Sequence, residues 1–536
     1  MRANDLKAKS VKNLCFCAIL LALCVFVAGV RLSMLQKSSE PNGLDGYFYA
    51  LQAKSLVETG RLENPSSQIG YYLCGACAFL AKDAITGVKV WSAVSSAGIS
   101  LAVFLLIFAL TGRSFLSLLG FLLASSSPTV TSLGINYINN QTGVCFLLLY
   151  SASLALLSRR RFSLNRRTVL LFLLSVLLFA LSALSHKVTL VFACALSLIV
   201  CVPKICSFVK QKIVRNLPFA LRLALSVFAF VFVLALSFLA FRFFRLHSPR
   251  FVHAFDYPSL PILFHKALIN AAGLGAIEMS VYAPLLYLLA ILAFFKKIPN
   301  RHLLLLVPIV YFPFWNLDRD MGIRMWLNAV PLGIPLVLYL FHLLAQKKSN
   351  RAVMPSAREQ TTENARTGHF DRLNDRIICV VCLILFAVLF FTPRAYYPEH
   401  DPPYLYYKTV VSSIELDSDS LLIAHLGLNH VYTYEKGLKD ALNWLPNFPV
   451  PAEKLWRLAY GANEIRIRSL LSKKELSLAD SESLIRKIDG NYTLIREDLW
   501  QSYLSREDER IARTFENWYN PHEVRPDYIR RARKVK

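Results

Sequence analysis

The chain has 536 residues, of which 55% are hydrophobic and 18% charged, whereas soluble domains carry about 25% charged residues. Long apolar stretches recur as far as Phe391, which excludes a soluble enzyme or a disulfide-stapled secreted domain as a description of the whole chain. Nearly all of the net charge of +25 lies in the apolar part, because residues 393–536 hold 22 of the 60 Lys/Arg and 21 of the 35 Asp/Glu. Excess basic residues beside membrane helices usually reflect topology, so no nucleic-acid partner is expected.

Residues 1–392 predict an all-α polytopic membrane domain with about eleven transmembrane helices, each with an apolar run of bilayer length. A polar segment, 346–376, is expected to be a cytoplasmic linker before the last of them. The candidate spans are 14–34, 90–111, 114–133, 142–157, 168–184, 188–203, 222–241, 281–295, 302–315, 326–345 and 377–392.

Residues 393–536 predict a soluble α/β or α+β domain. Leu421–Leu426 indicates a buried strand, and 453–472 and 498–518 have the pattern of amphipathic helices. This domain contains none of the eleven cysteines, so disulfides do not hold it together.

Loop charges predict the orientation. With a cytoplasmic N-terminus, the inside segments hold 25 Lys/Arg and 5 Asp/Glu, and the outside loops up to residue 392 hold 13 and 9. Basic residues concentrate on the cytoplasmic side of membrane proteins. We therefore expect an integral, multi-pass protein with its C-terminal domain outside. The absence of external disulfide candidates and the short loops favour a bacterial inner membrane, with that domain in the periplasm.

The first external loop, 35–89, is expected to lie against the membrane. Its segment Ile69–Ala81 is apolar but too short to span, so it predicts an interfacial helix. The pattern from Tyr47 to Val57 predicts a second helix, and Asp45 stands just before it. A carboxylate at that position is either the N-cap of the helix or a functional group.

Several motifs of this half of the chain resemble the GT-C glycosyltransferases, a superfamily that includes protein O-mannosyltransferases and the lipid A aminoarabinose transferase. The likeness extends over residues 14–205 by motif and 206–392 by architecture. The motifs are Asp45 with its following aromatic residues, Ala53-x-x-Leu56-x-x-x-Gly60 and Pro65, the Trp91–Gly98 segment, Ala124-Ser-Ser-Ser-Pro128, and Leu184-Ser-His-Lys-Val-Thr189.

The resemblance implies an inverting glycosyltransferase that uses a polyprenyl-phosphate sugar as donor. Asp45 would be the catalytic base that deprotonates an acceptor hydroxyl on a glycolipid, lipopolysaccharide or protein. Tyr47 and Tyr49 would line the substrate pocket.

No cofactor is expected. Many relatives have a second acidic residue where this chain has Gly46, so a metal-dependent mechanism is not favoured. Glu58 or Glu63 could still take that place beside a divalent metal. Cys74-x-x-Cys77 has the spacing of zinc ligands but lies in an apolar helix without a nearby histidine, so no metal site is predicted.

Two external turns supply candidate substrate ligands. Asn139, Asn140 and Gln141 can cap the fourth span or hydrogen-bond sugar hydroxyls. His186 and Lys187 occupy a short turn that faces the donor phosphate in relatives, although a lysine there can also extend to the membrane interface.

A later external segment adds Arg319 and Arg324. A guanidinium suits a phosphate group, and an arginine at the start of an apolar run needs an anionic partner. The alternative is an internal ion pair with Asp318 or Asp320.

Two other classes stay open. A polytopic lipid or saccharide transporter or flippase typically has broken or charged helices at mid-membrane and internal repeats. A non-catalytic assembly protein would tolerate replacement of Asp45 by asparagine. Polar residues here gather on one side of the membrane without a visible repeat, which favours the transferase.

Overall fold

The computed structural model describes residues 2–43, 45–159, 165–198, 327–328, 330–339 and 342–343, and in the C-terminal part 402–417, 420–424, 426–437, 441–442, 452–460, 485–489 and 492–496. The chain divides into two compact units. The first holds Met1–Leu35, Ser67–Gly70 and Val90–Tyr397, and the second holds Gln36–Ser66, Tyr71–Lys89 and Pro398–Lys536. Most of the predicted external loop therefore groups with the C-terminal part.

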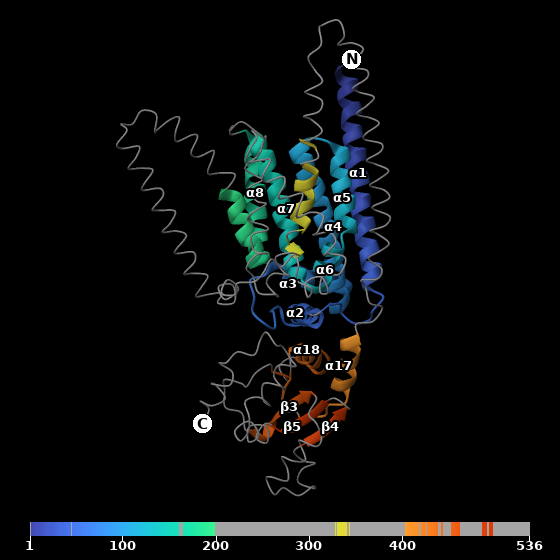
Figure 1. The fold of residues 1–536 in the computed structure, drawn as a ribbon, viewed down its shortest axis with the longest axis vertical. Helices are drawn as coiled ribbons and strands as arrows, with labels where there is room; N and C mark the ends of the chain where they lie inside the picture. Colours follow the sequence, from blue (N-terminus) through green and yellow to red (C-terminus); the bar gives the residue numbers. More distant parts are fainter. Residues whose placement is uncertain are drawn as a thin grey trace, which may run out of the picture. The chain divides into compact units, whose positions relative to one another are not determined.

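Membrane helices make up the first unit. Four helices of the described part are long and apolar enough to cross a bilayer, and they confirm the predicted spans 14–34, 90–111, 142–157 and 168–184. The chain is therefore an integral, multi-pass membrane protein. These helices are α1 (Arg2–Leu35), α4 (Ala84–Thr111), α7 (Ile138–Arg159) and α8 (Arg166–Ser185) (Figure 1).

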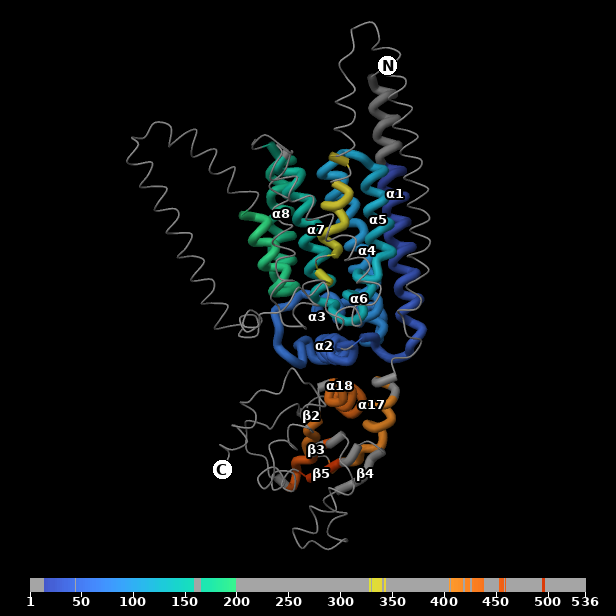
Figure 2. The backbone as a smooth tube through the Cα atoms, viewed as in Figure 1, coloured from blue at the N-terminus to red at the C-terminus, as the bar shows by residue number. Residues whose placement is uncertain are grey.

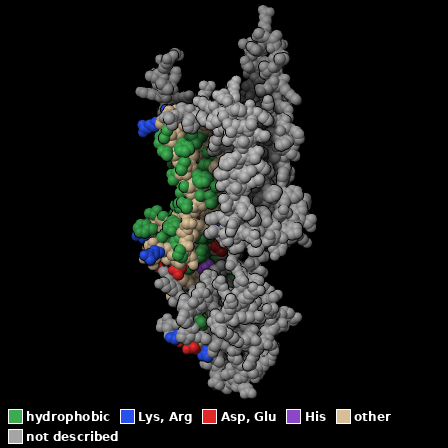
Figure 3. All heavy atoms as spheres, turned by 90° about the vertical axis from the view of Figure 1, so that its left-hand side faces the viewer, with side chains coloured by type: hydrophobic (Ala, Val, Ile, Leu, Met, Phe, Trp, Pro, Cys, Tyr) green, Lys and Arg blue, Asp and Glu red, His purple; other side chains and the backbone are tan. Residues whose placement is uncertain are grey.

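The core of this bundle is apolar and lies among α4, α5 (Ser114–Ser126), α7, α8 and residues 330–339. Ile107, Leu148 and Ile334 are fully buried in it. By contrast α8 buries only Ser175, Leu178, Ser182 and Ser185, and exposes most of its leucines and valines. Hydrophobic side chains predominate on the described part of the bundle that is visible in Figure 3, as expected of a surface in contact with lipid.

The predicted span 114–133 is not one straight helix. It consists of α5 and α6 (Pro128–Asn136), which meet at a bend of 50°. Pro128 has no N–H for a continuous helix. Ser127 is extended at the break, and its hydroxyl accepts from the Val130 N–H as the N-cap of α6. A proline and a serine cap end one helix and start another within the predicted span, and the bent pair together is long and apolar enough for one broken span or a re-entrant loop.

The remaining predicted spans are described partly or not at all. Lys187–Leu198 and Val330–Tyr339 are helical portions of the predicted spans 188–203 and 326–345. The four other segments, and the count of about eleven, lie outside the described residues and stay predictions. They are 222–241, 281–295, 302–315 and 377–392.

The second unit combines helices with a five-stranded sheet of order β2-β1-β3-β5-β4. β1 pairs in parallel with β2 and β3, and the β3–β5 and β5–β4 pairs are antiparallel. The helix α18 (Leu426–Lys436) lies between the sheet and α2 (Gly46–Thr59), as Figure 2 shows. The strands are β1 (Leu421–Ile423), β2 (Ala441–Leu442), β3 (Leu455–Tyr460), β4 (Ile485–Asp489) and β5 (Tyr492–Arg496).

Sequence patterns predicted some elements of this unit correctly, and β1 occupies the first half of the predicted strand Leu421–Leu426. α2 and α3 (Ile69–Ala81) begin and end close to where they were predicted. The predicted helix 453–472 was wrong over β3, whose Trp456 and Leu458 are buried in the sheet core. Pairing with β1 and β5 decides this segment, because strand preference depends on neighbours. The predicted helix 498–518 lies outside the described residues.

Candidate functional site

Asp45 occupies the position immediately before α2 but does not cap it. Its backbone lies at φ −106° and ψ 17°, outside the extended region usual for an N-cap, and its side chain makes no capping hydrogen bond. At the other end Gly60, at φ 72°, donates its N–H to the Leu56 carbonyl, a left-handed cap that glycine adopts without strain. The capping interpretation of Asp45 therefore does not hold in this structure.

Gly46 is closely surrounded. A Cβ at this position would lie 3.0 Å from Cβ and 3.1 Å from the carbonyl carbon of Pro41. Its N–H donates to the hydroxyl of Tyr404 at 3.1 Å. A side chain at this position would therefore require Pro41 to move by a few tenths of an ångström.

Tyr47 is fully buried in the core of the second unit. Its ring packs edge-on against Tyr404 at 5.0 Å and Tyr434 at 5.4 Å, and its hydroxyl donates to Glu40. Burial, followed by the hydrogen bond and charge of Glu40, raises the pKa of the Tyr47 hydroxyl. The Tyr47 side chain thus connects the segment around α2 with α17 (Pro402–Ser412) and α18. Its expected contact with substrate stays a prediction.

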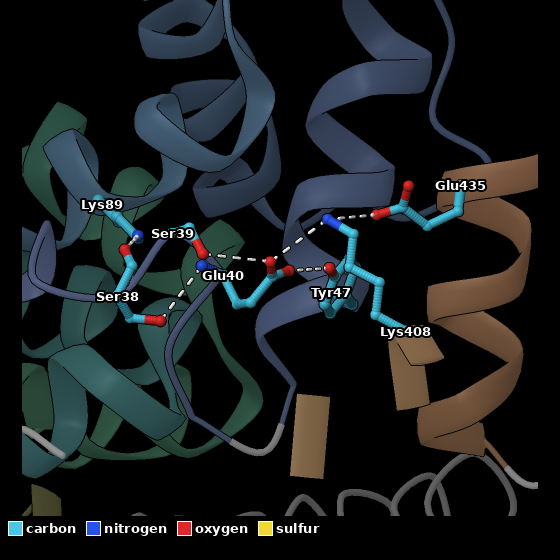
Figure 4. Close-up of polar contacts among 7 residues, drawn as sticks. All are labelled: Ser38, Ser39, Glu40, Tyr47, Lys89, Lys408 and Glu435. Atoms are coloured by element: carbon cyan, nitrogen blue, oxygen red, sulfur yellow. Dashed lines mark hydrogen bonds and ion pairs between the residues drawn. The ribbon is translucent and has the colours of Figure 1, made fainter. Parts of the chain in front are cut away.

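A charged network surrounds this tyrosine, as Figure 4 shows. The Lys408 ammonium lies 3.3 Å from a carboxylate oxygen of Glu40 and 3.2 Å from one of Glu435. Burial lowers the pKa of Lys408, but the hydrogen bond to Glu435 and the charges of Glu40 and Glu435 outweigh this and raise it. Glu40 is only 3% exposed, and its contacts with these partners compensate for the loss of water around its carboxyl group.

Tyr49 packs with other aromatic side chains between α2 and α3. Its ring lies 5.5 Å from that of Tyr71 in α3, and it is buried. Phe48 lies next to it, 5.7 Å from Tyr71 and 4.9 Å from His430 in α18. Burial lowers the pKa of His430 to about 4, so its imidazole is neutral near pH 7. The role of Tyr49 in a substrate pocket stays a prediction.

Lys89, in the second turn of α4, is a further buried charge of the second unit. Its ammonium donates to the Ser38 carbonyl at 2.6 Å, and the carboxylates of Glu40 and Asp83 interact with it electrostatically (Figure 4). Asp83 itself caps α4, since its carboxylate accepts from the Thr86 N–H at 2.7 Å. Of the two aspartates of this loop, Asp83 therefore caps a helix and Asp45 does not.

In the first unit, the amide residues at the start of α7 mainly bond to neighbouring helices. Gln141 accepts from the Ser95 hydroxyl at 2.7 Å and donates to that of Ser96, both in α4. Asn139 donates to the side chain of Gln68 at 2.6 Å. Asn140 is buried, and its amide nitrogen has no hydrogen-bond partner in the described part of the chain. Contact of these residues with a sugar stays a prediction.

The turn with His186 and Lys187 lies beside the start of α7. A Cβ on Gly143 would meet Thr189 and Ser185 at 2.6 Å and 3.2 Å, so these two segments are neighbours. The His186 ring nitrogen Nδ1 accepts from the Val188 N–H at 3.2 Å, which starts the next helix. The Lys187 side chain is exposed. The structure thus brings the predicted amide cluster and the predicted phosphate ligand into one region of the first unit.

The other predicted residues are not brought together. Arg319 and Arg324 lie outside the described residues. Glu58 is exposed near the end of α2, about 20 Å along the helix from Asp45 at 1.5 Å per residue, so it does not replace the missing second acid. Glu63 follows in the loop after α2. No group of three or more His, Cys, Asp or Glu side chains suited to a metal occurs among the described residues.

The sequence analysis missed Glu40, Lys89, Tyr404 and Lys408. Glu40 and Lys89 lie in the segment 35–89, which was predicted to be an external loop. Their charges stand close to apolar runs, and this could have indicated that they are buried. Tyr404 and Lys408 had no such signal, because they contact a loop more than 350 residues away.

The chain is similar to known proteins in its structure and not in its sequence. No protein-family model matches the sequence, and no curated protein matches it. In structure the chain is similar to ArnT from Cupriavidus metallidurans bound to undecaprenyl phosphate, with a TM-score of 0.54 at 11% identity over 90% of this chain and 97% of that one. The apo state of the same protein gives 0.53 at 12% identity, over 90% and 98%.

The Archaeoglobus fulgidus oligosaccharyltransferase in complex with Zn and sulfate is less similar, with a TM-score of 0.47 at 11% identity over 87% of this chain and 71% of that one. The likeness to ArnT shows the fold. The chain therefore shares the fold of ArnT, one of the proteins that its sequence motifs resemble.

Proposed function

We propose that this protein is an inverting glycosyltransferase that moves a sugar from a polyprenyl-phosphate donor to an acceptor hydroxyl outside the cytoplasm. The observation that carries the proposal is the position of Asp45, a carboxylate directly before α2 in the predicted external loop. A general base needs a carboxylate available to the reacting hydroxyl.

The proposed mechanism is a single displacement. Asp45 takes the proton of the acceptor hydroxyl as its oxygen attacks the anomeric carbon, and the bond to the lipid phosphate breaks with inversion. The leaving phosphate needs fixed positive charge, for which we propose Lys187 and Arg324, with Arg319 and His186 as further candidates. Lys89 adds a buried positive charge to the unit that contains Asp45.

Support for the donor class comes from the fold neighbour. ArnT was solved with undecaprenyl phosphate bound, and we propose that this chain binds a ligand of the same class. The acceptor class is a glycolipid, lipopolysaccharide or protein. The orientation from the loop charges, with the C-terminal part in the periplasm of a bacterial inner membrane, puts Asp45 on the acceptor's side.

The test compares cells that express the wild type, Asp45→Asn, Asp83→Asn or no copy. Glycolipids, lipopolysaccharide and glycoproteins are extracted and their masses measured. We expect the null strain and Asp45→Asn to lose the same sugar-sized increment, at equal protein abundance. Asp83→Asn is the matched control, because Asp83 caps α4 and asparagine caps equally well, so its profile should equal the wild type.

A transporter or flippase is the second candidate, and one observation favours it. The span formed by α5 and α6 is broken, and the guanidinium of Arg31 is buried against the break, which are features common in transporters. If Asp45→Asn restores the wild-type masses while the null strain loses one, the transferase proposal fails and the transporter becomes the better account.

A further inference from the structure

Two residues on either side of Asp45 in the sequence are joined by a side-chain hydrogen bond. Glu40 precedes Asp45 and Tyr47 follows it, and the Tyr47 hydroxyl donates to a carboxylate oxygen of Glu40. The backbone also approaches itself closely, because a Cβ on Gly46 would lie 3.0 Å from that of Pro41. Residues 40–43 and 45–47 therefore belong to a closed turn, which we call the Asp45 turn.

The Asp45 turn is attached to α17 through Lys408. The Lys408 ammonium lies 3.3 Å from a carboxylate oxygen of Glu40 and 3.2 Å from one of Glu435 (Figure 4). The Glu40 side chain is 4% exposed, whereas that of Glu435 is 29% exposed. Exposed ion pairs contribute little, but a buried charge that loses its partner is costly. Of the two ion pairs of Lys408, the one with Glu40 is therefore the one that matters for the fold.

Asp45 is part of the structure that this ion pair holds. Its backbone carbonyl accepts from the Tyr49 N–H at 3.0 Å, in the first turn of α2, so residue 45 moves together with Tyr47. A general base must lie within hydrogen-bond reach of the proton that it takes. A displacement of about 1 Å can lower the rate of a reaction about 100-fold.

We propose that Lys408 is a positioning residue, which acts through Glu40 to hold the Asp45 turn against α17. The proposal rests on the proposed function of Asp45 as the base. Replacement of Lys408 by methionine keeps a long side chain but leaves the buried Glu40 carboxylate without this counter-charge. The carboxylate then gains from exposure to water, which separates Glu40 from Tyr47 and opens the turn.

The first experiment measures hydrogen exchange of the purified full chain in detergent, by mass spectrometry of peptides that cover the Asp45 turn. We expect Lys408→Met to speed exchange of the turn about tenfold or more, the effect of one lost hydrogen bond to a charged group. The double variant Lys408→Met/Glu40→Gln should lie closer to the wild type. Both charges are then gone, and glutamine still accepts from the Tyr47 hydroxyl.

The matched control is Glu435→Gln, which removes the other carboxylate from the same ammonium group. Because this ion pair is partly exposed and does not involve the turn, we expect exchange within about twofold of the wild type. Lys89, the other positive group that interacts with Glu40, is the same in all variants.

The second experiment measures the transfer rate per folded molecule. Membranes with each variant are incubated with synthetic undecaprenyl phosphates bearing glucose, mannose or aminoarabinose, chosen by the sugar mass lost in the null strain. For Lys408→Met we expect kcat to fall at least about tenfold, with the KM for the donor within about twofold of the wild type, because a displaced base affects the transition state and not donor binding. The double variant should recover part of kcat.

Three results would overturn the proposal. One is wild-type exchange of the turn in Lys408→Met, and another is faster exchange with an unchanged kcat, which would indicate a merely structural role. The third is a double variant that is as impaired as Lys408→Met, because the loss would then not come from the uncompensated charge of Glu40.

The outcomes also separate this proposal from the proposed function. If Asp45→Asn keeps the wild-type masses, the base assignment fails and the positioning role of Lys408 falls with it. If Asp45→Asn is inactive while Lys408→Met keeps the wild-type kcat, the base assignment holds and only the role of Lys408 falls.

Discussion

Individual charged and aromatic residues connect segments of the second unit that are far apart in sequence. Glu40 is a buried carboxylate whose partners are Tyr47 from its own loop and Lys408 from α17. Removal of one partner from a buried ion pair costs more than the pair itself contributes, because the remaining charge is left without compensation. The loop around Asp45 is thus ordered by contacts that the loop cannot make alone.

His430 gives a prediction about pH. Its ring is 8% exposed against Phe48, and its pKa falls from an ordinary 6.5 to about 4. Between those values the unfolded chain binds a proton and the folded chain does not, so stability falls as pH is lowered from about 6.5 to about 4. The lowered pKa corresponds to an upper limit of roughly 3 kcal/mol of stability at neutral pH.

The measurement is the Tm of the full chain in detergent between pH 4 and 7, for the wild type and His430→Gln. Glutamine does not titrate in this range, so the variant should lose less Tm than the wild type on acidification. Equal slopes for both proteins would show that His430 is not the group responsible.

At the scale of elements, the break between α5 and α6 is stabilised from a third helix. The break leaves carbonyls in the last turn of α5 without helical partners. Arg31 of α1 donates to one of them, the Ser125 carbonyl, at 2.8 Å and to the Thr131 hydroxyl in α6 at 2.9 Å. Its positive charge also faces the negative end of the α5 dipole.

We therefore predict that Arg31→Met lowers the stability of the protein by about 2 kcal/mol, the typical contribution of hydrogen bonds from a charged donor. Thr131→Val removes only one of the two acceptors and should cost about half as much. Chemical denaturation in detergent micelles measures both. A methionine variant as stable as the wild type would mean that the break does not need this arginine.

Elements differ in how well their sequence predicts them. α2 has a turn residue at its end and regular apolar spacing, and α3 is apolar throughout, so both appear where expected. β3 was misassigned because its residues pack against strands that lie earlier and later in the chain. The α5–α6 break needed the joint effect of Pro128 and the Ser127 cap.

For the whole molecule, the loop charges predict which side of the membrane each end faces. The inside segments have 25 basic and 5 acidic residues against 13 and 9 outside, counted with a cytoplasmic N-terminus. In a bacterial host, alkaline phosphatase fused to the C-terminus should be active and green fluorescent protein fused there should not fluoresce.

Fusions within the predicted inner loop, after Arg161, provide the matched comparison and should behave in the opposite way. A fluorescent C-terminal fusion would reverse the predicted orientation. It would also put the segment with Asp45 on the cytoplasmic side, and the proposed acceptor class would no longer apply.

The amino-acid sequence by itself determined that this is a polytopic membrane protein and indicated the GT-C type of fold, since apolar length, loop charge and short motifs are local properties. It also singled out Asp45. It did not reveal whether that carboxylate caps its helix, because a cap depends on the backbone conformation of the folded loop. Only the tertiary structure brought Tyr404, Glu40 and Lys408 to the loop, since buried charges and hydroxyls find partners across the fold and not along the chain.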